Sequence, residues 1–157
     1  MTEAPVVFDR RAVRRKRERA AMRVGSVAAL LDDFAARLIE RLDDTTRRFS
    51  RALDLGGRGV VAPLLRARGI AVVAGDLSPR MAALSGAPCL ALDEEFLPFA
   101  PASFDLVIAS LSLHEVNDLP GATISTSAPA AAVVAPLTPY CLGSGPRQIT
   151  RAAPARA

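Results

Sequence analysis

The stretch that decides the fold is ALDLGGRG at residues 52–59, a short apolar run that leads into three glycines within four residues. Glycine is needed where the backbone adopts positive φ or approaches a ligand closely. Residues 60–68 can form a helix, and the first turn of a helix offers free N–H groups to a polar or anionic ligand. The stretch therefore predicts a strand, a tight turn and a helix, with a ligand at the turn.

The same alternation continues along the chain. Apolar runs at 70–74, 89–92 and 104–109 are separated by segments that can be helical, and Ser78-Pro79 has the residue types of an N-cap and a first helical position. Strands that are continuously apolar and alternate with helices form parallel sheets covered on both faces. We therefore predict an α/β fold with four parallel strands and helices on both faces.

The N-terminal part predicts two helices before the first strand. Residues 27–42 have apolar side chains at helical spacing, with Ser26 as the expected N-cap. The segment from Arg10 to Arg23 holds eight basic residues. A basic run can bind nucleic acid or an acidic partner, but no aromatic residues interleave it as single-strand binding would require. We favour a solvated, partly helical segment.

Acidic residues follow the second and third predicted strands. Asp76 lies twenty residues after Gly56, where a carboxylate can accept both ribose hydroxyls of a nucleoside. Asp93 ends the third strand, where it could meet the adenine edge. Since the carboxyl ends of parallel strands share one edge of the sheet, these groups predict a cofactor that contains adenosine.

The glycine spacing distinguishes between two such cofactors. Glycines at 56, 57 and 59 fit poorly the G-x-G-x-x-G pattern of NAD-binding proteins. The carboxylate of Asp54 would repel a pyrophosphate but suits the amino group or sulfonium of S-adenosyl-L-methionine. The sequence therefore favours S-adenosyl-L-methionine over the cofactor of an NAD-linked dehydrogenase.

Four blocks of sequence resemble the class I S-adenosyl-L-methionine-dependent methyltransferases of the methyltransferase type 11 kind. The blocks are DEEFLPF at 93–99, SFDLV at 103–107, SLSLH at 110–114 and VNDLP at 116–120. The most similar branch contains the mitochondrial complex I assembly factor that is methyltransferase-like and its alphaproteobacterial relatives. The malonyl-carrier-protein methyltransferase of biotin synthesis is a more distant relative. The resemblance covers about residues 6–121 and implies a Rossmann-like class I methyltransferase fold, truncated after about four parallel strands.

The resemblance also assigns site residues. It implies a cofactor site made of Asp54, Gly56, Gly57, Gly59, Asp76, Leu77, Asp93, Glu94, Ser110 and Leu111. His114, the only histidine, could act as a general base, although we favour a structural loop role. The chain departs from the family in three places: its glycine motif is one residue shorter or lacks the last glycine, Glu115 replaces the usual tryptophan, and the family's continuation after Leu119-Pro120 is missing.

We divide the chain into a helical N-terminal lead-in at 1–48, a partial S-adenosyl-L-methionine-binding domain at 49–121 and a tail at 122–157. Ala, Pro, Ser and Thr supply 22 of the 36 tail residues, and no acid occurs there. Recurrent prolines predict that no helix or parallel strand forms in the tail. The resemblance implies further strands at this point, so we expect a tail that is disordered or that results from a frameshift near residue 122.

The expected function is methyl transfer from S-adenosyl-L-methionine to an unknown acceptor, which could be a small molecule, a carrier protein or a protein side chain. The alternatives are an assembly or accessory protein of respiratory complex I, with a complex I subunit as partner and a chemistry such as arginine hydroxylation, and an inactive fragment. The sequence shows neither a metal-ligand cluster nor a membrane span. We expect the bacterial cytoplasm, in preference to the mitochondrial matrix.

Overall fold

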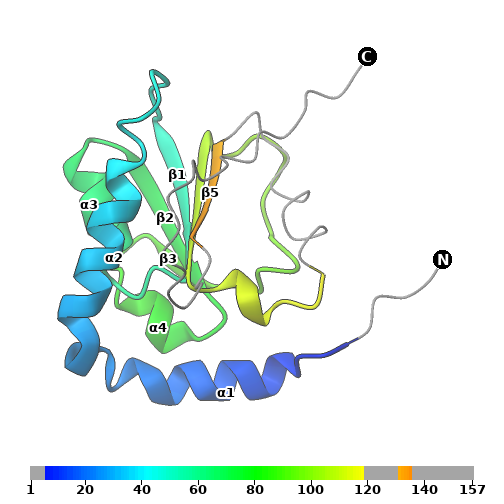
Figure 1. Cartoon of the computed structure of the whole chain (residues 1–157). Coiled ribbons are helices and arrows are strands. Elements are labelled where there is room, and N and C mark those ends of the chain that lie inside the picture. Colours follow the sequence, from blue (N-terminus) through cyan, green and yellow to red (C-terminus); the bar gives the residue numbers. More distant parts are fainter. Residues whose placement is uncertain (1–5, 119–130, 136–157) are drawn as a thin grey trace, which may run out of the picture.

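The computed structural model describes residues 6–118 and 131–135, and it contains one sheet of five parallel strands in the order β3-β2-β1-β4-β5 (Figure 1). The strands are β1 (Arg51–Leu55), β2 (Ala71–Asp76), β3 (Cys89–Ala91), β4 (Leu106–Ser110) and β5 (Ala131–Ala135). The α-helices are α1 (Arg10–Ala21), α2 (Ala28–Glu40), α3 (Val61–Ala67) and α4 (Pro79–Ala83), and the 3-10 helices are η1 (Val24–Val27) and η2 (Leu113–Glu115).

Strand β1 is the centre of the sheet. Leu53 of β1 pairs with Val73 of β2 on one side and with Val107 of β4 on the other, in parallel register. The chain order therefore reverses at β1, because β2 and β3 extend the sheet in one direction and β4 in the other. In open α/β sheets, ligands bind outside the carboxyl ends of the strands at such a reversal. The four predicted strands and the Rossmann-like arrangement are confirmed.

The two faces of the sheet are covered differently. On one face, α2 and α3 bury an apolar cluster that includes Leu38, Leu65 and Ile108. On the other face, the strands pack against the loop between β3 and β4, where the rings of Phe99 and Phe104 meet edge to face at 4.9 Å. We expected helices on both faces. In the described part of the chain, the loop and η2 take the place of a helix on the second face, because the β3–β4 connection is rich in prolines and turns.

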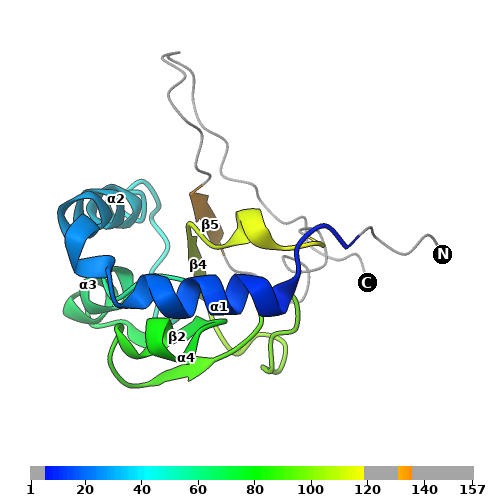
Figure 2. The same ribbon diagram turned by 90° about the horizontal axis from the view of Figure 1, so that it is seen from below.

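The N-terminal helices form as expected except for one cap. Asp9 caps α1 by accepting the N–H groups of Arg11 and Ala12. Ser26 does not cap α2, because it lies inside η1 and its hydroxyl donates to the carbonyl of Arg23 at 2.7 Å. Helix α1 lies across the carboxyl ends of the strands, as the two perpendicular views show (Figures 1 and 2). Within the described ranges, no helix combines the length and the apolar character that crossing a bilayer requires.

The tail contains one strand that the proline argument did not predict. Residues Ala131–Ala135 form β5, which pairs in parallel with β4 from Leu106 to Ser110. Our expectation that no parallel strand forms in the tail is wrong for these five residues. Pro129 and Pro136 flank the segment, so every residue of β5 keeps its N–H for the ladder. The remainder of the predicted tail lies outside the described residues.

The core on the helical face predicts the cost of a cavity. Leu65 is fully buried between α2, α3 and the sheet, whereas its neighbour Leu64 is 38% exposed. We expect Leu65→Ala to lower the free energy of unfolding by about 2–5 kcal/mol and Leu64→Ala by less than about 1 kcal/mol. Chemical denaturation of the two variants measures this difference. Equal losses would contradict the placement of α3 on the sheet.

Candidate functional site

The turn after β1 forms in spite of its shortened glycine motif. Gly56 and Gly59 have φ of +69° and +86°, and Arg58 between them has φ of +49°. A Cβ at Gly56 would lie 2.6 Å from the Cβ of Ser112, and one at Gly59 would lie 2.8 Å from the carbonyl oxygen of Leu84. Both glycines are therefore required by conformation and by space, as the sequence indicated.

The side chain of Arg58 stabilises this turn. Its guanidinium donates to the carbonyl oxygens of Gly56 at 3.0 Å, Ser110 at 2.9 Å and Leu111 at 2.8 Å. It thereby connects the end of β1 with the end of β4. Burial and the charge of the nearby Arg17 lower the pKa of Arg58. Sequence reasoning did not single out this residue, because an arginine within a glycine turn is ordinarily a surface side chain.

The side chain of Asp54 lies behind the same turn. This side chain is fully buried, and neither carboxylate oxygen forms a hydrogen bond of normal geometry with the described side chains and backbone atoms. A Cβ at Gly57 would lie 2.1 Å from Oδ2 of Asp54, so the carboxylate lies directly behind that glycine. Burial raises the pKa of Asp54 to about 7, and the Ala62 amide and the Arg66 guanidinium offset this only partly.

Asp76 ends β2 beside this turn, as predicted. Its Oδ1 accepts the N–H of Ser78 at 2.8 Å, and its Oδ2 lies 3.4 Å from a guanidinium nitrogen of Arg17. Burial raises the pKa of Asp76, although the charge of Arg17 opposes that effect. Leu77 is half-buried between these polar neighbours, and the hydroxyl of Ser78 caps α4 by accepting the N–H of Met81.

Asp93 and Glu94 follow β3 and contact the first arginine of α1. Arg10 donates to both carboxylate oxygens of Asp93, at 2.7 and 3.2 Å, and also to Glu94. Glu94 is fully buried and lies between Arg10 and Arg17. Two positive charges therefore neutralise the acids that end β3.

Arg17 is the centre of this edge of the sheet. Its side chain is buried, and it pairs with Glu94, Asp76 and Glu115. It also donates to the carbonyl of Ser112 at 3.3 Å. Burial alone would lower the pKa of Arg17, but the surrounding carboxylates raise it, so the guanidinium stays charged.

The segment after β4 completes the network. Glu115 in η2 pairs with Lys16 at 2.7 Å as well as with Arg17, and these cations lower its pKa although burial acts in the opposite direction. Asn117 accepts the N–H groups of Val7 and Phe8 at 2.7 Å each. His114 is exposed on the same short helix.

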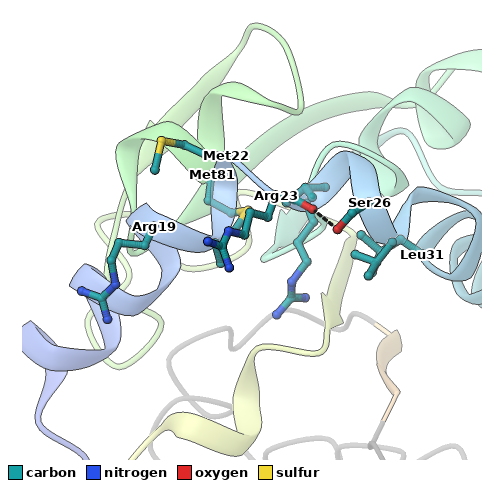
Figure 3. A pocket seen from close by; sticks show the side chains of 10 residues that line it. Arg19, Met22, Arg23, Ser26, Leu31 and Met81 are labelled. Atoms are coloured by element: carbon teal, nitrogen blue, oxygen red, sulfur yellow. Dashed lines mark hydrogen bonds between the residues drawn. The ribbon is translucent and has the colours of Figure 1, made fainter.

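A hollow of about 540 Å³ opens next to the turn (Figure 3). Arg19, Arg23 and Arg58 contribute positive charge to its wall, and Met22 and Met81 contribute apolar surface. No lining residue is acidic. The hollow therefore suits an anionic group carried on an apolar body.

The structure brings the predicted glycines and acids together at one edge of the sheet, with Ser110 and Leu111 at the end of the neighbouring β4. Sequence reasoning missed the basic partners of these acids and treated α1 as a solvated segment. One signal was available: Arg10 and Arg17 are seven residues apart, which places both on one face of a helix. Within residues 6–118 and 131–135, no group of three or more His, Cys, Asp or Glu side chains could hold a metal ion.

Comparisons with known proteins agree with this geometry. Residues 53–125 match the protein family described as "Methyltransferase domain". The chain is 38% identical over 125 residues to the mitochondrial arginine-hydroxylase NDUFAF5 of Danio rerio, and this match covers 74% of this chain and 39% of that protein. It is 37% identical over 126 residues to the malonyl-[acyl-carrier protein] O-methyltransferase of Halorhodospira halophila, and this match covers 73% of this chain and 43% of that protein.

The chain thus spans about two fifths of the length of these curated relatives. Among solved structures, one chain of the complex between the Haloferax volcanii Trm112 methyltransferase activator and its partner is similar in fold to this chain. The match has a TM-score of 0.63 at 20% identity, over 73% of this chain and 54% of that chain.

The buried carboxyl group of Asp54 predicts a pH dependence of stability. The unfolded chain loses this proton near the ordinary value for aspartic acid, whereas the folded chain retains it up to about pH 7. The folded state therefore binds more protons between these values, so stability falls as the pH rises and levels off above about pH 7. Asp54→Asn should remove the part of this decline that comes from Asp54, roughly a few kcal/mol, and leave the smaller part that comes from Asp76.

Denaturation curves recorded between about pH 5 and pH 8, where proteins are ordinarily most stable, measure this effect. Asp44→Asn, at an exposed acid, is the matched control and should retain the wild-type slope. An unchanged slope in Asp54→Asn would contradict the placement of this carboxyl group.

Proposed function

Because the chain belongs to the class I family of S-adenosyl-L-methionine-dependent methyltransferases, we propose that it binds S-adenosyl-L-methionine at the carboxyl edge of the sheet and positions it for methyl transfer. The single observation that supports this most strongly is the combination of a left-handed glycine turn after β1 with a buried carboxylate at the end of β2. That pair of features suits an adenosyl group.

The donor set fits the nucleoside part of the cofactor. In this proposal Asp76 accepts the ribose hydroxyls, and Asp93 and Glu94 lie beside the adenine. Leu77 contributes apolar surface next to the ribose. The carboxylates have the required chemistry, although Arg10 and Arg17 bond to them in this structure.

The turn and the end of β4 fit the amino-acid part. Gly56, Gly57 and Gly59 allow close approach of the backbone, and Ser110 and Leu111 border the same place. Asp54 acts through the turn that it supports, since its carboxylate lies behind Gly57. When bound, S-adenosyl-L-methionine supplies an electrophilic methyl group on its sulfonium, and the protein orients that group for in-line attack.

The hollow beside Arg58 supports an acidic acceptor. Its three arginines attract a carboxylate or phosphate and repel a cation. A carboxylate acceptor agrees with the name of the Halorhodospira relative, which is an O-methyltransferase of a malonyl group. His114 is exposed on η2 and stays the candidate general base of this proposal.

A second candidate function rests on the identity to NDUFAF5, whose name is that of an arginine-hydroxylase. Under it, the chain is an assembly or accessory protein for respiratory complex I. The arginine-lined hollow disfavours an arginine side chain as substrate in that place. Methyl transfer would release S-adenosylhomocysteine, whereas the accessory role would show binding of the cofactor without this product.

The proposed cellular location depends on which of these two functions applies. We propose the bacterial cytoplasm for the methyltransferase. The alternative is the mitochondrial matrix, since the NDUFAF5 relatives are named as mitochondrial proteins.

Calorimetric titration of the purified chain with S-adenosyl-L-methionine tests the proposal. We expect saturable binding in the wild type, and at least a roughly tenfold weaker affinity in Asp76→Ala, because the ribose loses its charged acceptor. Asp44→Ala, far from the edge, should bind like the wild type. Absence of binding both in the folded wild-type chain and in folded variants that release Arg17 from Asp76 would overturn the proposed function.

A further inference from the structure

Helix α1 bonds to every carboxylate that the proposed function assigns to the nucleoside. Arg10 uses two nitrogens on Asp93, and Arg17 reaches Asp76 and Glu94. The arginines come from residues 10–17 and the acids from residues 76–94, so these contacts exist only while α1 lies across the edge of the sheet (Figure 2).

These bonds occupy the oxygens that a ribose would need. Oδ1 of Asp76 already accepts the Ser78 N–H, and Oδ2 faces the guanidinium of Arg17. The residue is only 2% exposed, so no free side of the carboxylate remains for a diol. A ribose and the guanidinium of Arg17 therefore exclude each other at Asp76.

We propose that α1 is a gate over the cofactor site, in which Arg10 and Arg17 hold the nucleoside carboxylates in the closed form and must withdraw before the cofactor binds. This inference rests on the proposed function. The cofactor's hydroxyls and adenine then replace the guanidinium groups as partners of the same acids.

The attachment of α1 is suited to exchange. Of its twelve residues only Val13 and Arg17 are buried, so polar contacts rather than apolar packing hold the helix in place. Helix α2, by contrast, buries Leu31, Leu38 and Ile39 and stays fixed to the sheet. Opening α1 alone removes little apolar surface from contact.

The connection between these two helices permits the movement. Gly25 in η1 is exposed, and no atom lies within 4 Å of where its Cβ would be. On its outer side α1 is attached to α4 by Glu18, which pairs with Arg80 at 2.9 Å and accepts the hydroxyl of Ser78. This outer contact can be weakened without touching the buried acids.

The gate makes a quantitative prediction, because a ligand that binds only the open form has an apparent affinity reduced by the open fraction. Arg17→Met keeps the bulk of the side chain and removes its charge. Glu94 retains Arg10, and Glu115 retains Lys16, whereas Asp76 loses the Arg17 guanidinium and keeps the N–H of Ser78. We expect S-adenosylhomocysteine to bind Arg17→Met about tenfold more tightly than the wild type.

Arg14→Met is the matched control, because Arg14 is exposed on the same helix and forms no ion pair with any residue of the described ranges. It should bind S-adenosylhomocysteine like the wild type in the same calorimetric titration. Glu18→Gln is a second opening variant that leaves the buried network intact. It should tighten binding by about two- to threefold, and it serves if Arg17→Met does not fold.

Hydrogen exchange of the α1 amides gives a second readout in the wild type. The gate predicts that S-adenosylhomocysteine accelerates exchange across residues 10–21. Slower exchange together with weaker binding by Arg17→Met would overturn the gate and make Arg17 a cofactor ligand, while the proposed function stands. Absence of binding in the folded wild type and in both opening variants would overturn the gate and the proposed function together.

Discussion

The buried guanidinium of Arg17 is the interaction on which the arrangement of this edge of the sheet depends. Three carboxylates, from the end of β2, from the residues after β3 and from η2, contact the same guanidinium there, and like charges gathered in a buried place are unfavourable without a cation. One cation from α1 balances them, and a second from Arg10 helps it. The N-terminal helix is therefore part of the site rather than an appendage to the domain.

The same charge balance explains why the departure at Glu115 is compatible with the fold. A carboxylate at this position would be unfavourable against the sheet by itself, but it meets Lys16 and Arg17. The shortened glycine motif has a comparable solution. Arg58 adopts a left-handed conformation, and its side chain donates to three carbonyl groups, so it connects the shortened turn to the end of β4.

Polar contacts and apolar packing divide the molecule into two parts. The helical face of the sheet is held by fully buried aliphatic side chains such as Leu65 and Ile108, which fix α2 and α3. The carboxyl edge is held by ions, which can exchange one partner for another of similar polarity. The site therefore lies on a sheet that apolar packing holds rigid, and it is covered by a helix whose polar contacts can exchange partners. A protein that binds and releases a polar ligand requires both properties.

The sequence by itself determined the parallel strands, the glycine turn and the acids at strand ends, because continuous apolar runs and glycines act locally. It also indicated the cofactor class, since Asp54, Gly56 and Asp76 lie within one strand–turn–helix–strand unit. Only the tertiary structure decided what those acids contact. Arg10 and Arg17 lie about sixty to one hundred residues from their partners along the chain, and no local pattern specifies such pairs. Strand β5 was missed for a related reason: a five-residue strand between two prolines is fixed by its pairing with β4, and pairing is a property of the fold.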